Sequence, residues 1–321
     1  MSAGASAQPH SRRRVRLLGA VLGAALLVLV VGVLGLRHAG APQRCPEGLV
    51  ALGPRCCAPG QYLQSTGAEG GRSKQYTRAA LCRGRPERCP AGMRASPDGC
   101  VPVRRRVLVR GGQLRLGAAD WEAPLPVEAR AVEVASFRLD SHEVTEEGYA
   151  ACVAAGRCPP LPLAGEPGRP VVGATAAEAE GYCRFVGGRL PRAYEIAFAA
   201  MGPGARRYPW GDTGAVCRRA AFGLADGPCA QGGIGPDLAG ARPDGASPEG
   251  VHDLAGNVAE WVRSGGPSGP AARDGEGVEV RGGSWRARSA AALRGWYARP
   301  AAPGARADDV GWRCAYDEGP P

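Results

Sequence analysis

The sequence predicts a compact α+β domain that follows a transmembrane helix and a small disulfide-rich module. Three observations support this prediction: twenty consecutive apolar residues at 17–36, six cysteines between residues 45 and 100, and one short and two central helix patterns among short strand patterns after residue 107. Glycine and proline are frequent (50 and 29 residues), so many turns are expected. We divide the chain into a basic cytoplasmic tail (1–16), an anchor (17–36), a cysteine-rich basic module (37–106) and the main domain (107–317).

The apolar run LLGAVLGAALLVLVVGVLGL at 17–36 contains no charged residue. At about 1.5 Å per residue it matches the ~30 Å thickness of a bilayer core. Four arginines precede the run, and the positive-inside rule therefore keeps the short N-terminus in the cytoplasm. We expect a single-pass protein of a bacterial inner membrane with a periplasmic C-terminal domain. A cleaved signal peptide is the alternative, since HAGA at 38–41 resembles a cleavage site, but the apolar region of signal peptides is usually only about 7–15 residues long.

The basic charge is concentrated in the N-terminal third. Residues 1–106 carry 17 basic and 4 acidic side chains, whereas residues 107–321 carry 23 basic and 26 acidic ones. Because the larger part of the chain is mildly acidic, a nucleic-acid-binding protein is not expected. The basic module at 37–106 is suited to contact with anionic lipid or an envelope polymer, or is a solvated spacer.

Twelve cysteines agree with a location outside the cytoplasm, where an even number indicates disulfides. The module holds Cys45, Cys56, Cys57, Cys82, Cys89 and Cys100, for which fifteen pairings exist and the sequence does not choose among them. In the main domain, Cys152 and Cys158 are close enough to pair locally. The chain has no CxxC and no HxxxH pattern, so a zinc site is not expected.

Strands and helices alternate irregularly in the main domain. The stretch at 104–117 is a basic linker followed by alternating residues typical of a strand. A further strand pattern occurs at 132–145, and strands are expected to resume at GVEVRGGSW and GWRCAYD. Thr145 is expected to cap a helix over 146–155 that Gly156 ends. Thr175 and Glu178 form a capping box at the start of the next helix, which Gly187 and Gly188 end. Pro191 is expected at the first position of a further helix in LPRAYEIAFAAMG, followed by a turn-rich region from 202 to 250.

The stretch VHDLAGNVAEWVR (251–263) predicts a shaped turn. It contains Asp253, Gly256, Asn257 and Glu260, residue types that helices or strands disfavour in this combination. A metal ion held by side-chain and backbone oxygens would explain the turn. A turn closed only by its own hydrogen bonds, with Asp253 and Asn257 accepting from nearby amides, is the alternative.

Six ordered blocks resemble a known family: FRLDSHEVTEEGYAACV, PVVGATAAEAEGYCRFVGGRLPRAYEIAFAA, RYPWGD, GVHDLAGNVAEWV, VRGGSW and GWRCA. Together they resemble the sulfatase-modifying-factor family, whose best-known member is formylglycine-generating enzyme. The resemblance covers residues 107–317. It implies an irregular α+β fold related to C-type lectin-like folds, with little regular secondary structure.

The resemblance also implies one structural calcium ion at the 251–263 turn. Its side-chain ligands would be Asp253 and Glu260, and its carbonyl ligands Gly256 and Val258, a donor set that a hard cation accepts. A second calcium site of the family relies on an asparagine-containing segment, and the matching stretch AAFGLADG (220–227) has no asparagine. The resemblance further pairs Cys183 with Cys314, and Cys152–Cys158 and Cys217–Cys229 are the local pairs that remain.

Copper is not expected. Formylglycine-generating enzyme binds Cu(I) with two cysteines, and soft thiolates are the ligands that Cu(I) selects. The two matching positions fall on or near Ala292 and Tyr297, and no cysteine lies between Cys229 and Cys314. With all six cysteines of the domain paired, no thiol is left for copper.

We therefore expect a binding or scaffold module for an envelope protein, peptide or glycan. The segment that lines the family's groove offers arginine and aromatic side chains suited to bidentate and stacking contacts: Trp285, Arg286, Arg288, Arg294, Trp296 and Arg299. Arginines on a solvated edge and aromatics in the core are the alternative.

An oxidoreductase of the formylglycine-generating or non-haem iron type, acting on a sulfur-containing or protein substrate, is the second hypothesis. It would need His142 and His252, the only histidines of the domain, to hold iron with Asp253 or Glu143. Nothing in their spacing requires such a site.

Overall fold

The computed structural model describes residues 45, 48–52, 55–66, 79–116, 130–230, 235–265 and 277–318. All of them belong to one compact unit, Arg44–Pro321. The apolar run at 17–36 lies outside the described residues, so the expected anchor stays a prediction. Within the described part, no helix has both the length and the apolar character needed to cross a membrane.

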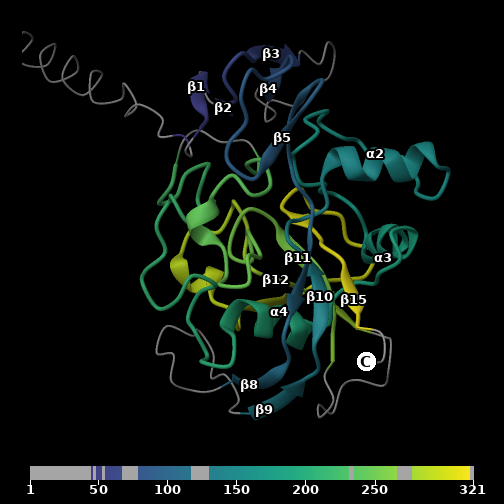
Figure 1. Ribbon diagram of the computed structural model, residues 1–321, viewed down its shortest axis with the longest axis vertical. Helices are drawn as coiled ribbons and strands as arrows, with labels where there is room; N and C mark the ends of the chain where they lie inside the picture. Colours follow the sequence, from purple (N-terminus) through teal and green to yellow (C-terminus); the bar gives the residue numbers. More distant parts are fainter. Residues whose placement is uncertain are drawn as a thin grey trace, which may run out of the picture. The chain divides into compact units, whose positions relative to one another are not determined.

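Three short antiparallel hairpins form the cysteine-rich part (Figure 1). They pair β1 (Val50–Leu52) with β2 (Arg55–Cys57), β3 (Tyr62–Thr66) with β4 (Ala79–Arg83), and β5 (Met93–Ser96) with β6 (Gly99–Pro102). The disulfides are Cys45–Cys56, Cys57–Cys82 and Cys89–Cys100. Disulfides supply the stability that so small a set of buried apolar residues cannot.

These hairpins pack directly against the main domain. The amide of Cys82 donates to Glu166 Oε1 at 2.9 Å, and Arg94 forms an ion pair with Glu147. A Cβ atom on Gly168 would lie 1.8 Å from the carbonyl oxygen of Cys100, so only glycine allows this close approach. The cysteine-rich part and the main domain are therefore held together by specific contacts.

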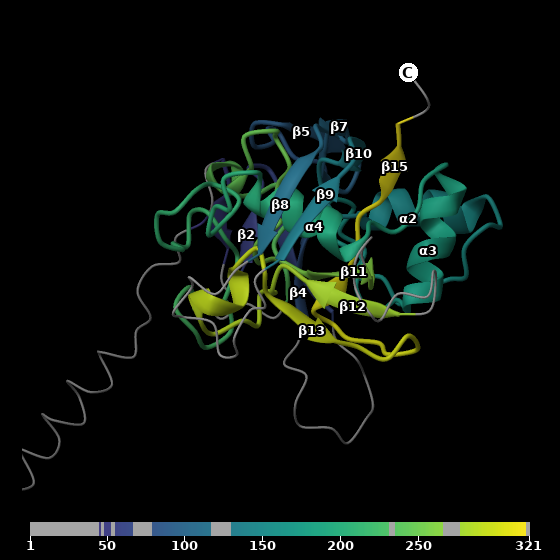
Figure 2. The same ribbon diagram turned by 90° about the horizontal axis from the view of Figure 1, so that it is seen from below.

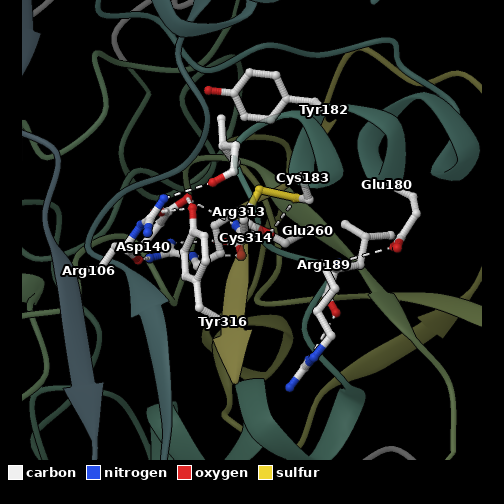
Figure 3. The surroundings of a disulfide bond; sticks show 12 residues. Arg106, Asp140, Glu180, Tyr182, Cys183, Arg189, Glu260, Arg313, Cys314 and Tyr316 are labelled. Carbon is white, nitrogen blue, oxygen red and sulfur yellow. Dashed lines mark hydrogen bonds and ion pairs between the residues drawn. A yellow bond between two sulfur atoms is a disulfide. The ribbon is translucent and has the colours of Figure 1, made fainter. Parts of the chain in front are cut away.

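The arginines expected in a basic linker at 104–106 also bind the main domain. Arg104 Nε and Nη2 donate to the fully buried carboxylate of Asp140 at 3.0 and 2.7 Å. The Arg106 guanidinium lies 3.9 Å from the centre of the Tyr316 ring, and both residues stand beside Asp140 (Figure 3). These contacts fix the path by which the chain enters the main domain.

Two sheets and one hairpin make up the strands of the main domain. The first sheet has the order β15 (Ala315–Asp317), β10 (Phe137–Asp140), β7 (Arg106–Val109). The second has the order β13 (Ala298–Pro300), β12 (Val278–Arg281), β11 (Ala259–Arg263), β14 (Val310–Gly311). The hairpin pairs β8 (Gly112–Leu116) with β9 (Arg130–Val134). All pairs are antiparallel except β11 with β14.

The first two helices follow the sequence prediction. Helix α2 (Glu146–Ala154) begins after Thr145, whose side chain accepts a hydrogen bond from the amide of Gly148. Helix α3 (Ala176–Phe185) begins with the expected capping box, in which the side chains of Thr175 and Glu178 each accept a hydrogen bond from the backbone amide of the other residue. The two helices contact each other on one side of the first sheet (Figure 1).

The third helix, α4 (Ala193–Met201), begins later than predicted. Pro191 lies before the helix instead of at its first position, because Arg192 has extended backbone and acts as the N-cap residue. The carbonyl of Pro191 accepts a hydrogen bond from the amide of Arg263 at the end of β11. Helix α4 packs against the β8–β9 hairpin and against strands β11 and β12 (Figure 2). Between Gly202 and Gly250 the described chain holds turns and one 3₁₀ turn, Pro243–Gly245.

One of the three buried apolar clusters in the described part of the chain lies where α2 and α3 pack against the two sheets. Trp261 and Trp312 are fully buried there, together with Tyr149 and Tyr182. A disulfide between Cys183 in α3 and Cys314 crosses this core (Figure 3).

Candidate functional site

The turn at 251–263 has the bent backbone that its sequence predicted. Asp253 and Asn257 both have a φ of 56°, and Gly256 has a φ of 92°. Asp and Asn tolerate this left-handed region better than other side chains do. A Cβ atom at position 256 would lie 2.6 Å from the carbonyl oxygen of Ala221, so glycine is required there. Strand β11 begins directly after the turn, at Ala259.

Glu260, an expected calcium ligand, forms a buried ion pair with Arg313. Arg313 Nε donates to Oε2 at 2.8 Å and Nη2 donates to Oε1 at 2.6 Å, and both side chains are almost completely buried (Figure 3). Burial raises the pKa of Glu260, while the Arg313 guanidinium opposes that rise. Both oxygens of the carboxylate are therefore already occupied by a cation of the chain itself.

Two further buried carboxylates lie near this pair. Glu143 accepts from Asn257 Nδ2 at 2.8 Å and from the amide of Val258 at 3.2 Å. Asp253 Oδ2 accepts from the amide of Gly240 at 2.5 Å. Burial raises the pKa of Glu143 well above its ordinary value, and the neighbouring Asp253 and Glu260 add to the rise. Burial likewise raises the pKa of Asp253.

The expected calcium donor set is thus only partly available. Asp253 and the carbonyl-bearing residues Gly256 and Val258 lie in one turn, but Glu260 would have to release Arg313 to bind an ion. Among the described residues, no group of three or more His, Cys, Asp or Glu side chains is arranged to hold a metal ion. The stretch 220–227 matches the second calcium site of the family. Four of its residues are buried in an apolar cluster: Ala220, Ala221, Phe222 and Leu224.

The structure brings together the two histidines of the iron hypothesis. His142 and His252 stack with ring centroids 4.5 Å apart and an angle of 13° between the ring planes. A metal ion binds in the plane of an imidazole, and two stacked rings with nearly parallel planes do not both point at one ion. His142 Nδ1 instead lies 2.8 Å from Ser141 Oγ. Burial, with His252 and Arg313 nearby, lowers the pKa of His142 to about 3.

Every cysteine of the chain is in a disulfide. The three pairs expected in the main domain are present: Cys152–Cys158, Cys183–Cys314 and Cys217–Cys229. With the three pairs of the hairpins they account for all twelve cysteines, so no free thiol exists. The positions that match the copper ligands, Ala292 and Tyr297, lie in the 3₁₀ turn Ala290–Leu293 and just after it.

The expected groove residues do not form one accessible surface. Trp285 and Arg294 are each only 2% exposed, which corrects their assignment to a ligand-binding surface. Arg294 stacks on Tyr208, with its guanidinium carbon 4.5 Å from the ring centre. Trp296 is partly buried against the cluster around α4.

Three arginines of this segment remain at least partly exposed, and each is paired with an aspartate. The pairs are Arg286–Asp308, Arg288–Asp226 and Arg299–Asp309. This surface therefore presents neutralised ion pairs and not a field of positive charge.

Three residues organise the centre of the domain: Arg313, Glu143 and Asp140. Sequence reasoning missed Arg313 and Asp140, and it considered Glu143 only as a possible iron ligand. All three are buried and charged, whereas charged residues are usually placed on the surface from a sequence. The one available signal was the position of Arg313 between Trp312 and Cys314, two residues expected in the core.

These features define a compact α+β domain with irregular loops and an internal network of charges. Residues 93–318 match the family described as the Sulfatase-modifying factor enzyme 1-like domain, FGE-sulfatase. This chain belongs to that family. The match begins in β5, so the β5–β6 hairpin falls within the family domain that we expected to begin at 107.

Two curated relatives are similar to parts of this chain. The serine/threonine-protein kinase pkn1 of Chlamydia pneumoniae is 32% identical over 254 residues, covering 65% of this chain and 37% of the kinase. Hercynine oxygenase of Mycolicibacterium thermoresistibile is 37% identical over 102 residues, covering 30% of this chain and 21% of the oxygenase. The chain thus spans well under half the length of either relative.

A solved structure has the same fold. PvdO from Pseudomonas aeruginosa matches with a TM-score of 0.54 and 22% identity, over 68% of this chain and 95% of PvdO. At this identity the likeness concerns the fold alone.

Proposed function

We propose that the chain is a membrane-anchored, extracytoplasmic member of its family that acts as a binding or scaffold module without copper oxidase activity. The observation that carries the proposal is the pairing of all twelve cysteines. Cu(I) needs soft ligands such as thiolates, and a disulfide sulfur does not replace them. Ala292 and Tyr297 offer no such ligand at the matching positions.

Six disulfides also support a location outside the cytoplasm, where thiols are not kept reduced. The apolar run at 17–36 with its preceding arginines supports anchoring in the inner membrane. Both features support the proposal that the domain lies on the periplasmic side.

The exposed ion pairs favour a polypeptide ligand from the envelope over a strongly anionic polymer. Arg286 and Arg288 already face Asp308 and Asp226, so the local charge is close to balanced. Exposed pairs of this kind contribute little to stability, and they can exchange partners with a ligand that carries both signs of charge.

A Cu(I) titration against a chromophoric chelator tests the loss of copper activity. We expect the full chain to bind no Cu(I) in competition with the chelator and to form no aldehyde from a cysteine-containing peptide in air. The variant A292C/Y297C is the matched control and should gain Cu(I) binding. Aldehyde formation by the unmodified protein would refute the proposal.

Crosslinking to envelope proteins tests the binding role. We expect one set of crosslinked polypeptides with the full chain and loss of that set with R286Q/R288Q. The control R157Q/R184Q removes two exposed arginines near α2 and α3 and should leave the crosslinks unchanged. Equal loss in both variants would count against the proposed surface.

An oxygenase role is the second candidate, because hercynine oxygenase is a relative over 102 residues. Since His142 and His252 stack nearly in parallel, such a role would need iron ligands from elsewhere. Iron analysis of the purified chain tests it, and stoichiometric iron that is retained in the double variant H142Q/H252Q would support a site elsewhere in the chain.

A further inference from the structure

We propose that the Arg313 guanidinium is the cation that closes the 253–260 turn, in the place where a bound calcium ion would otherwise balance the carboxylates. The turn would then be independent of calcium. This inference concerns the ion requirement of the fold and does not depend on the proposed binding role.

Arg313 joins both ends of the turn to the first sheet. Its guanidinium donates to both oxygens of Glu260 after the turn and to the carbonyl oxygen of His252 before it, at 2.8 Å. Nη1 also donates to the carbonyl oxygen of Asp140 at the end of β10, at 3.2 Å. A planar guanidinium suits this task, because its N–H groups point outward in a fixed fork that matches a carboxylate. One side chain thus links three segments that a bound ion would otherwise connect.

The carboxylate oxygens around the turn are already satisfied by donors of the protein. Glu143, Asp253 and Glu260 have six carboxylate oxygens between them, and five of these accept a hydrogen bond from an N–H group. Calcium takes six to eight oxygen ligands. To use these carboxylate oxygens, an ion would have to displace the buried ion pair and hydrogen bonds from backbone amides.

The neighbours of Arg313 hold its side chain in place. Trp312 and Cys314 are both fully buried, and Cys314 is bonded to Cys183 in α3 (Figure 3). The amide of Cys314 also donates to Asp140 Oδ2 at 3.2 Å. Because the backbone on each side is fixed, little side-chain freedom remains to be lost when the guanidinium binds Glu260.

Thermal unfolding of the purified full chain, in excess calcium and in excess chelator, tests the proposal. We expect the unmodified protein to melt at the same temperature in both solutions. A higher melting temperature in calcium would overturn the proposal and favour a bound ion with Asp253 and Glu260 as ligands.

Substitution of Arg313 provides a second, independent readout. R313Q should lower the melting temperature by much more than the control R286Q, which removes an exposed arginine that is also paired with an aspartate. A loss in R313Q no larger than in R286Q would overturn the proposal. If R313Q does not fold, R313K keeps the charge without the fork; we expect it to melt below the unmodified protein, and unchanged stability in R313K would count against the proposal.

Discussion

Cys183 in α3 is bonded to Cys314, 131 residues further along the chain, and the bond lies fully inside the core. It connects a helix on one side of the first sheet to the residue that precedes β15. The same segment carries Arg313, so the disulfide positions both the last strand and the central guanidinium. The pairing was expected from the family resemblance, and the structure contains it.

We predict that this bond stabilises the fold more than the other disulfides of the main domain do. The loop-entropy relation gives ~5 kcal/mol for a loop of this length and ~2 kcal/mol for the short loop between Cys152 and Cys158. The double variant C183A/C314A should therefore lose about 2–3 kcal/mol more in the free energy of unfolding than C152A/C158A. Chemical denaturation of the two variants measures the difference, and equal losses would contradict the loop argument.

Local patterns in the sequence predicted the elements whose ends are fixed by neighbouring residues. Thr145, and Thr175 with Glu178, begin their helices because each hydroxyl oxygen accepts from an amide three residues on. Pro191 did not follow its local preference, because its carbonyl is used by Arg263 in the adjacent sheet. A contact between distant segments overrode the helix-start signal.

The candidate site was less predictable for the same reason. The sequence identified the bend at Asp253, Gly256 and Asn257 from residue types alone. It gave no sign that Glu260 would pair with Arg313, which lies 53 residues away. The burial of Trp285 and Arg294 likewise depends on the packing of Tyr208 and its surrounding loops, which no periodic pattern reports.

We predict that His142 makes a contribution to stability that is lost in mild acid. Burial lowers the pKa of this histidine from 6.5 to about 3, so below pH 6.5 the unfolded chain binds a proton that the folded protein does not. The contribution of His142 to the free energy of unfolding is present above pH 6.5, and it is lost as the pH falls from 6.5 toward 3. The loss attributable to His142 approaches ~1.4 kcal/mol per pH unit in this window.

The variant H142Q isolates this contribution from the buried acids, whose raised pKa values act in the opposite direction. Its free energy of unfolding should decline less steeply between pH 6.5 and pH 4 than that of the unmodified protein. Parallel pH profiles for the two proteins would contradict the prediction, because they would mean that the pKa of His142 is the same in the folded and the unfolded protein.

We predict that the mature chain keeps residues 17–36 as its anchor. The run is as long as a bilayer core is thick, and four arginines precede it. Mass spectrometry of the protein isolated from membranes should find the N-terminal segment intact. A mature chain that begins near Pro42 would show that a signal peptide had been removed.

We predict that Glu146 holds the loop after α2 and that its neighbour Glu147 matters much less. The Glu146 carboxylate is buried and accepts from the amides of Ala164, Gly165 and Glu166, at 2.9, 2.6 and 2.9 Å. Glu147 instead forms a partly exposed ion pair with Arg94, and such pairs contribute about 0–1 kcal/mol.

Replacement by glutamine keeps the shape at both positions and removes the charge. In E146Q one oxygen becomes an NH₂ group that faces backbone donors, so at least one of the three amides loses its acceptor, at a cost of about 1–3 kcal/mol where that amide is buried, as it is at Glu166. The loop at 164–166 also contacts Cys82 through Glu166, so E146Q should weaken the contact between the β3–β4 hairpin and the main domain. Hydrogen exchange at the amides of residues 164–166 should therefore accelerate in E146Q and stay unchanged in E147Q. Equal protection of these amides in both variants would mean that the loop is held by the hairpins and not by Glu146.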